Sequence, residues 1–296
     1  MRLLITTQAM DASDPVLGFF VQWVEEFAKH CEQVTVICLR RGEYSLPQNV
    51  RVFALGRGGK AARAYKLMRG AYAFRNNYDA VFVHMNPEYL VAAGWLWRFL
   101  GKRTVLWYMH KSVDLKLRVA TLFVNAIVTG SRESFRLPTK KLTVLHHGID
   151  TGYFSPDPTI ARGSHWLSVG RLNASKRHDV IIREAAQAHK ALRIAGEGPE
   201  RAHLEALARE LKAQVEFLGG RAHAQLRDEY RRAALFVHRS ETGSLDKVVL
   251  EALACGCPMS TADPALKFLE HEGPAYVQKN HSLQTLIPRI LEVLHG

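Results

Sequence analysis

The segment W-L-S-V-G-R-L-N-A-S-K-R-H-D-V-I-I-R-E-A-A-Q-A-H-K-A-L-R-I-A, residues 166–195, decides the fold. Its apolar run Trp166–Val169 predicts a buried strand, and Gly170 then permits the turn that ends it. His178–Ala188 has the spacing of a helix, and Leu192–Ala195 predicts a second buried strand. A strand, a helix and another strand in this order indicate a parallel sheet covered by helices.

The same alternation runs through the rest of the chain. Towards the C-terminus it predicts strands at Val215–Leu218, Leu235–His238 and Pro258–Thr261, with helices at Glu200–Leu211, Gln225–Ala233 and Lys247–Ala254. Towards the N-terminus it predicts strands at Arg2–Thr6, Val34–Leu39, Val50–Ala54, Ala80–His84, Thr104–Tyr108, Ala126–Thr129 and Thr143–Leu145. A stretch rich in glycine, proline and serine, residues 148–163, predicts a linker. We therefore expect an α/β chain of two Rossmann-like, doubly wound domains, 1–155 and 156–296, facing each other across a cleft.

Composition limits the class of protein. The 296 residues are 47% hydrophobic, which is enough for two modest cores. The four cysteines have neither the spacing of a zinc site nor that of a disulfide framework, so we expect a reducing compartment. The N-terminal apolar run Leu3–Ile5 stops too soon for a signal peptide, and the run Tyr89–Trp97 is too short to span a bilayer. These features predict a soluble, cytoplasmic protein.

Charge is distributed unevenly along the chain, whose net charge is +12. Residues 1–150 hold 21 Lys and Arg against 11 Asp and Glu, whereas residues 151–296 hold 19 against 17. A basic first half predicts an anionic partner, which composition alone leaves open between nucleic acid, phospholipid headgroups and a pyrophosphate-linked substrate. We expect no nucleic acid, because the basic residues show neither a reader-helix motif nor aromatic strands of the kind that bind RNA.

Three loops in the second half follow predicted strands, where parallel sheets present ligands. Ser168–Lys176 offers Gly170 for a turn and the cations Arg171 and Lys176 for a diphosphate, although a glycine turn with surface charges would look the same. Ala195–Pro199 carries Gly196 and Gly198, which bring backbone amides close to a ligand or simply form a tight turn.

The third loop, Ser240–Glu251, enters a helix at whose start Thr242, Gly243 and Ser244 leave backbone N–H groups free for an anion. Glu251 lies six residues after Leu245, roughly 9 Å along the helix, where it can accept bonds from a ribose next to that anion. The alternative for Glu251 is a surface residue paired with Lys247. Asp246 is equally compatible with a charge in the first turn of the helix.

Four segments of this half, G-R-L-x-x-x-K, A-G-E-G-P, V-E-F-L-G-G and L-E-A-L-A-C-G-C-P, resemble in this order the C-terminal domain of the group 1 glycosyltransferases. These are retaining enzymes of the GT-B fold. The segment H-H-G-I-D-T-G-Y-F-S-P, residues 146–156, is similar to the hinge of that family. Leu17-Gly18-Phe19 resembles its glycine-containing loop.

The resemblance implies roles for individual residues. Arg171 and Lys176 neutralise the donor pyrophosphate, Glu251 holds the ribose, and the backbone around Phe217 and Leu218 lines the base pocket. The implied residue at the reacting sugar is His110, although one of 14 histidines is more often structural, and His84, His146 and His147 carry that doubt more strongly.

One position departs from the family motif. Its paired glutamates would place the first at position 243, where this chain has Gly243. The candidates that take over the lost sugar contact are Glu241, Ser244, Asp246 and Lys247. The identity of the donor sugar is therefore open.

The implied reaction moves a hexose from a nucleotide-diphosphate sugar to a hydroxyl of a sugar or lipid-linked acceptor, with retention, in bacterial cell-surface polysaccharide or glycolipid synthesis. No cofactor and no metal are expected, because the sequence holds no D-x-D triplet. The rivals are a GT-B epimerase or sugar phosphorylase, and a non-catalytic protein that binds a nucleotide sugar. The base, guanine, uracil or adenine, is not fixed.

The segment Arg57–Arg75 predicts a basic helix that touches a membrane. Ala61, Tyr65, Met68 and Tyr72 recur at helical spacing and are flanked by cations, as in interfacial helices. An ordinary packed helix with a solvated basic face fits the pattern equally well. The net charge of the first half favours peripheral contact with the anionic inner face of a membrane.

Overall fold

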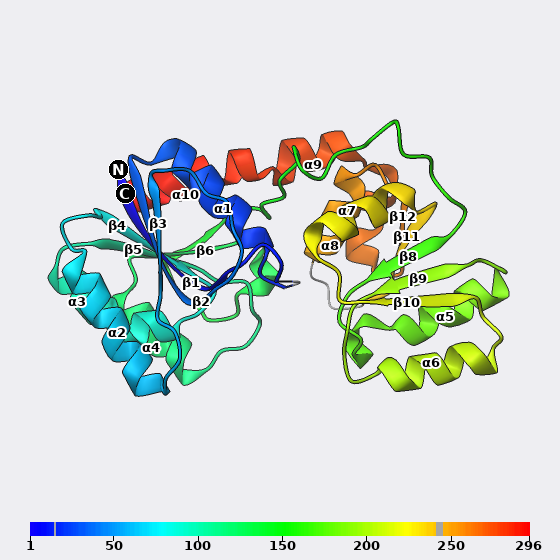
Figure 1. Ribbon diagram of the computed structural model, residues 1–296, viewed down its shortest axis with the longest axis horizontal. Helices are drawn as coiled ribbons and strands as arrows, with labels where there is room; N and C mark the ends of the chain where they lie inside the picture. The colour runs from blue at the N-terminus through cyan, green and yellow to red at the C-terminus, as the bar shows by residue number, and fades with distance from the viewer. Residues whose placement is uncertain (15, 241–244) are drawn as a thin grey trace. The chain divides into compact units, whose positions relative to one another are not determined.

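The structure is a computed structural model that describes residues 1–14, 16–240 and 245–296 (Figure 1). It divides into two compact units. Unit 1 comprises Met1–Gly148 together with Leu283–Gly296, and unit 2 comprises Ile149–Ser282. In the part of the chain that the structure describes, no helix is both long and apolar enough to cross a membrane.

Unit 1 contains a seven-stranded sheet in the order β3-β2-β1-β4-β5-β6-β7, and its strand pairs are parallel. The strands are β1 (Arg2–Met10), β2 (Gln33–Arg41), β3 (Val50–Ala54), β4 (Ala80–His84), β5 (Arg103–Trp107), β6 (Ala126–Thr129) and β7 (Leu142–Val144). Strand β1 is central and buried on both faces: Leu3 and Ile5 enter one core, and Leu4 between them enters the other. This explains its continuous apolar sequence.

Helices cover both faces of this sheet (Figure 1). On one face lie α1 (Phe19–His30) and α10 (Leu283–His295), and on the other lie α2 (Lys60–Ala73), α3 (Glu88–Phe99) and α4 (Leu115–Phe123). The loop after β6 contains the short 3-10 helix η1 (Arg132–Ser134). The carboxyl ends of β1 and β4 flank the point where the strand order reverses, which is where such sheets bind ligands.

Unit 2 contains a five-stranded parallel sheet in the order β10-β9-β8-β11-β12. Its strands are β8 (Trp166–Val169), β9 (Leu192–Ala195), β10 (Val215–Gly219), β11 (Leu235–His238) and β12 (Met259–Thr261). One face packs on α5 (His178–Gln187) and α6 (Arg201–Glu210), and the other on α7 (His223–Arg232), α8 (Lys247–Ala254) and α9 (Pro274–His281). The 3-10 helices η2 (Ala174–Lys176) and η3 (Pro264–His271) complete the unit, and its strand order reverses between β8 and β11.

The predicted strands are all present, and two parallel sheets covered by helices confirm the expected α/β, doubly wound class. The main difference is the length of β1, which continues to Met10 rather than ending at Thr6. Thr6 and Thr7 are buried, so the polar residues that suggest an end to the strand lie inside the sheet.

The last helix belongs to a different unit from the one expected. The sequence assigns residues 283–296 to a second domain that begins at 156, but α10 belongs to unit 1 and unit 2 begins at Ile149. The physical reason is the apolar stripe of α10, whose Leu286, Ile287 and Ile290 are fully buried in the core beneath α1. Gly148 permits this packing, because a Cβ there would lie 2.7 Å from Leu286 Cδ2.

Replacing Ile290 by alanine should destabilise unit 1 by about 2–5 kcal/mol, because it leaves a cavity under the last helix. Hydrogen exchange should then lose protection in β1 and α1 while β8 stays protected. Glu292→Ala, at an exposed position of the same helix, is the control and should change stability by less than about 0.5 kcal/mol. Equal loss of protection in β1 and β8 would contradict the assignment of α10 to unit 1.

Candidate functional site

The loops at the carboxyl ends of β8, β9 and β10 are held together by glycine. A Cβ on Gly196, whose φ is +146°, would lie 1.9 Å from the carbonyl oxygen of Gly170. A Cβ on Gly198 would lie 2.3 Å from the carbonyl oxygen of Leu172. Backbone hydrogen bonds join the same loops, from Gly170 N to Ala195 O at 3.0 Å and from Gly196 N to Gly219 O at 2.8 Å. These glycines therefore serve close backbone packing, which was the alternative expected for Ala195–Pro199.

The two predicted phosphate cations have different surroundings. Arg171 follows β8 and its side chain is exposed. Lys176 ends η2, and its Nζ donates to Asp246 Oδ2 at 2.5 Å. Asp246 is the N-cap residue of α8, so this ion pair ties the loop after β8 to the start of α8. This ion pair and the backbone contacts between the turns after β8 and β9 thus bring together the three loops that sequence reasoning assigned to one site.

Asp246 also accepts a hydrogen bond from His238 Nε2 at 2.8 Å. Burial by itself would raise the pKa of Asp246, but the bond from His238 and the charge of Lys176 outweigh it and lower that pKa to about 2. Sequence reasoning missed His238. The available signal was its place as the last residue of a predicted strand, which puts its side chain at the ligand edge of the sheet.

Glu251 is buried and engaged on both carboxylate oxygens. Its Oε1 lies 3.1 Å from Lys247 Nζ, and its Oε2 accepts a hydrogen bond from the Tyr230 hydroxyl at 3.2 Å. Burial lowers the pKa of Lys247, and the nearby Glu251 partly offsets this. The i,i+4 pair with Lys247 is therefore present, but it lies inside the unit rather than on its surface.

Other residues predicted for this site lie further along the same edge. Phe217 and Leu218 are half-buried in β10, and the Arg201 guanidinium carbon lies 5.6 Å from the centre of the Phe217 ring. Leu245 is half-buried against the core formed by α7 and α8. Glu241, Thr242, Gly243 and Ser244 lie outside the described residues.

In unit 1, His110 follows β5 and its side chain is exposed. Its Nδ1 lies 2.8 Å from Ser112 Oγ. A cavity of about 220 Å³ has His110, Gln8, Tyr108 and Asp114 among its lining residues. This cavity, called the His110 cavity below, lies where the strands of unit 1 end. Its position is the one expected for a ligand of a parallel sheet.

The remaining residues singled out in unit 1 have structural surroundings. Gly18 lies where a Cβ would come within 2.6 Å of the Asp14 carbonyl oxygen, so the turn before α1 requires glycine. His84 is buried, lies 3.0 Å from Thr7 Oγ1, and stacks on Phe20 with ring centres 3.8 Å apart. His147 is buried and His146 half-buried, next to the end of unit 1. These surroundings fit a structural rather than a catalytic role for His84, His146 and His147.

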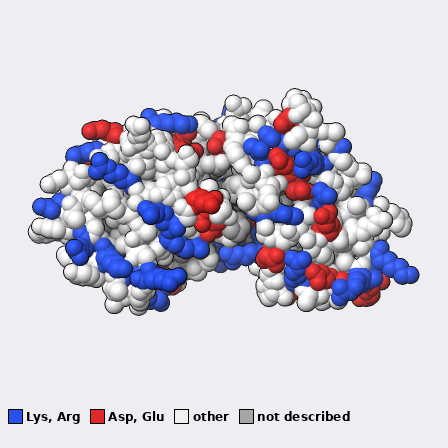
Figure 2. All heavy atoms as spheres, viewed as in Figure 1, with Lys and Arg blue, Asp and Glu red and all other residues white. Residues whose placement is uncertain are grey.

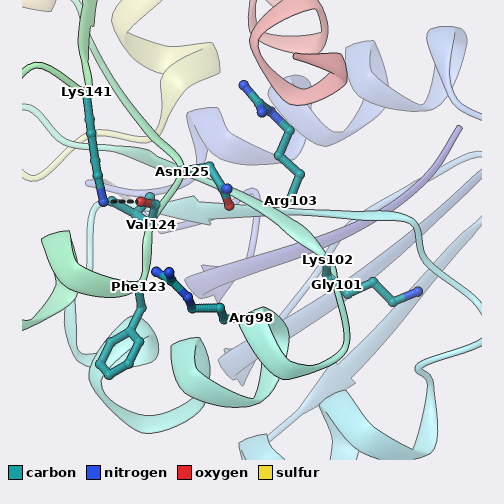
Figure 3. Close-up of a pocket in the computed structure, with 8 residues that line it drawn as sticks. All are labelled: Arg98, Gly101, Lys102, Arg103, Phe123, Val124, Asn125 and Lys141. Carbon is teal, nitrogen blue, oxygen red and sulfur yellow. Dashed lines mark hydrogen bonds between the residues drawn. The ribbon is translucent and has the colours of Figure 1, made fainter.

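Basic side chains are spread over the surface of unit 1 on the face shown in Figure 2, whereas unit 2 shows both charges intermixed. Some cations of unit 1 stabilise the fold. In a cavity of about 480 Å³, Arg98 Nη1 donates to the carbonyl of Leu122 at 3.1 Å, and Lys141 Nζ donates to those of Thr121 and Val124 (Figure 3). They cap the last turn of α4. The cavity lies next to the start of β5, away from the ligand edge of the sheet.

The chain is similar to known glycosyltransferases in sequence and in fold. Residues 163–295 match the family model described as "Glycosyl transferases group 1". The gpi3 subunit of phosphatidylinositol N-acetylglucosaminyltransferase from Schizosaccharomyces pombe is 33% identical over 130 residues, which are 40% of this chain and 28% of that protein. D-inositol 3-phosphate glycosyltransferase from Mycobacterium tuberculosis is 32% identical over 139 residues, 41% of this chain and 29% of that protein. The chain thus spans less than a third of these relatives.

Solved structures resemble the whole chain. Alr3699/HepE from Anabaena, in complex with UDP and glucose, has a TM-score of 0.75, 16% identity and full coverage of both chains. AviGT4, which is involved in avilamycin A biosynthesis, has a TM-score of 0.69 and 13% identity over 100% of this chain and 97% of that one. The predicted GT-B fold is confirmed, and residues 163–295 match the model of the family that the sequence motifs resemble.

Stability should fall in weak acid because of a buried histidine. Burial lowers the pKa of His178 to about 4, so this side chain stays neutral in the folded state while the unfolded chain takes up a proton below about pH 6.5. The stabilisation is complete above pH 6.5 and is lost as the pH falls towards 4. Between pH 7 and pH 5 it should decrease by about 2 kcal/mol.

Urea unfolding at both pH values measures this loss, which should be smaller by that amount in His178→Asn. The matched control is His189→Asn, an exposed histidine with φ of +51°, a conformation that asparagine tolerates. It should keep the full pH dependence. An unchanged dependence in His178→Asn would contradict the assignment to His178.

Proposed function

We propose that this protein is a nucleotide-sugar-dependent glycosyltransferase that moves a hexose to an acceptor hydroxyl with retention of configuration. Unit 2 binds the donor, and the His110 cavity of unit 1 receives the acceptor. The observation that carries this proposal is the Lys176–Asp246 ion pair, which joins the two loops flanking the strand-order reversal within the region that matches the family. UDP is the first nucleotide to test, because the similar Anabaena protein binds it.

The ion pair has a direct consequence for donor binding. Asp246 neutralises Lys176 while no diphosphate is bound, since isolated charges at a partly buried site are costly. A diphosphate that approaches Lys176 therefore competes with Asp246, which keeps its own bond from His238. Arg171, by contrast, is exposed to solvent and can meet the diphosphate first.

The transition state develops negative charge on the leaving diphosphate. Two cations and the amide groups at the start of α8 stabilise this charge without a metal ion. Glu251 accepts hydrogen bonds from the ribose through the lone pairs that Lys247 and Tyr230 leave free. His110 contacts the transferred sugar. Of the residues that could replace the sugar contact of the missing glutamate, Asp246 lies where the start of α8 meets the loop after β8.

Cell-surface polysaccharide or glycolipid synthesis in the cytoplasm, at the inner face of a membrane, is the setting we propose. The contacts of α2 support the membrane part. Its core-facing residues are Leu67 and Ala71, so Tyr65 and Tyr72 remain 61% and 51% exposed. On the neighbouring α3, Trp95 and Phe99 are 50% and 83% exposed. Exposed aromatic rings among cations are typical of surfaces that bind anionic membranes.

Two substitutions should separate the parts of the donor site. Lys176→Ala should weaken both UDP and pyrophosphate by roughly 10- to 100-fold, because a charge-assisted contact to phosphate is lost. Glu251→Gln should weaken UDP and leave pyrophosphate nearly unchanged, because it acts on the ribose. Isothermal titration calorimetry with both ligands, in excess EDTA, measures these changes, and GDP and ADP replace UDP if UDP does not bind.

Two controls accompany this experiment. Lys190→Ala, at an exposed lysine before β9, should bind both ligands normally. Tyr230→Phe removes the other hydrogen bond to Glu251 and shows how much of the effect comes from the buried network. Normal binding of both ligands by Lys176→Ala, or binding that requires a divalent metal, would refute the donor site. Release of free nucleotide only when an acceptor is present would favour a transferase over an epimerase.

The exposed aromatic residues of α3 should contribute to membrane binding. Co-sedimentation with vesicles should increase with anionic lipid, decrease with salt because surface charges are screened, and weaken in Trp95→Ser and Phe99→Ser. Phe268→Ser, at a 50% exposed phenylalanine of unit 2, is the matched control and should bind as the unaltered protein does. Vesicle binding that depends neither on lipid charge nor on the two α3 substitutions would refute the membrane-binding role of this surface.

A further inference from the structure

A second hollow of unit 1 adjoins the His110 cavity. It is about 370 Å³ in volume, which is within the range of small-molecule pockets, roughly 300–1,000 Å³. It lies between α2 and α3, and we call it the α2–α3 groove. Asn86, Glu88 and Lys116 line both the groove and the His110 cavity, so the two hollows meet at these residues.

The walls of the groove are mainly apolar. Leu67, Leu55 and Tyr89 are buried around it, and the small side chains of Ala64 on α2 and Ala92 on α3 leave space between the helices. The groove therefore suits an alkyl chain, for which transfer from water to an apolar wall is favourable by about 0.8 kcal/mol per buried CH₂ group.

Positive charge lies at the same groove. Lys60 and Arg63 come from the first turn of α2, where backbone N–H groups also favour anions. The buried Nε of Arg63 has no hydrogen-bond partner among the described residues. The carboxylate among the lining residues of the described chain is that of Glu88, and it is already paired with Lys116. A buried donor without a partner is costly, and an anionic group bound here would supply one.

We propose, on the basis of the function proposed above, that the acceptor is a lipid phosphate that carries the reacting sugar. Its alkyl chain occupies the α2–α3 groove, its phosphate is bound by Lys60 and Arg63, and its sugar hydroxyl reaches the His110 cavity through the junction at Asn86. The cavity and the groove thus bind the two ends of one amphiphilic substrate.

Decyl phosphate, kept below its critical micelle concentration, is the probe for the full-length chain in titration calorimetry. It should bind at least tenfold more tightly than inorganic phosphate or the uncharged decyl maltoside, because only decyl phosphate has both the chain and the charge. Arg63→Gln should reduce its affinity about tenfold by removing the charge. Ala92→Phe should do so by filling the groove from α3.

Two matched variants control for helix charge and for membrane binding. Arg69→Gln removes an exposed cation of α2 outside the groove, and Phe99→Ser alters the aromatic surface of α3. Both should bind decyl phosphate normally. Full affinity in Arg63→Gln and Ala92→Phe, or inorganic phosphate binding as tightly as decyl phosphate, would overturn the inference.

UDP binding in the same samples distinguishes this inference from the proposed donor site. Variants that keep UDP binding are folded in unit 2, and an unchanged circular dichroism spectrum of the whole chain then shows that unit 1 keeps its secondary structure as well. If the unaltered protein binds UDP but shows no preference for decyl phosphate, the lipid phosphate alone is overturned. Decyl phosphate binding without nucleotide binding would instead refute the donor site.

Discussion

The absence of a side chain at Gly196 is the constraint on which the candidate donor site depends. The carbonyl of Gly170 occupies the space that a Cβ of residue 196 would need, so the turns after β8 and β9 touch backbone to backbone. Arg171 and Lys176 lie in the loop that begins at this contact. The contact therefore fixes their positions relative to α8. Any larger residue at position 196 would separate the two turns and move both cations. The glycines thus shape the site without needing to contact a ligand.

The charges of the candidate donor site are organised around two carboxylates, Asp246 and Glu251. Asp246, before α8, holds Lys176 and His238, and Glu251, inside α8, holds Lys247 and Tyr230. Each carboxylate is therefore partly satisfied before any ligand arrives, which limits the cost of burying it. Partners already in position need little rearrangement when a charged ligand binds, because the surrounding dipoles are oriented in advance. A single short helix combines these roles.

Sequence was sufficient for the strands, the order of the loops and the likeness to the family model, because each depends on local patterns such as apolar runs and glycine turns. It was insufficient where a helix can pack in more than one way, on either of its sides or against either of two cores. Helix α2 carries apolar residues on two sides. Leu67 and Ala71 face the sheet, whereas Tyr65 and Tyr72 are exposed to solvent. Helix α10 has a clear apolar stripe, but a stripe does not specify which core it enters. The pairing of Lys176 with Asp246 depends on β8 lying beside β11, a strand order that only the folded chain reveals.

The place of α10 has a consequence for synthesis on the ribosome. Unit 2 is continuous in sequence and ends at Ser282, so its residues have all been made before α10 is complete. Unit 1 starts first but is completed last, because its core remains open beneath α1 until residues 283–296 leave the ribosome. Domains generally fold in the order in which they emerge, so this chain reverses the usual sequence. The nascent N-terminal half therefore exposes apolar surface for the longest time and has the greatest need of protection from aggregation.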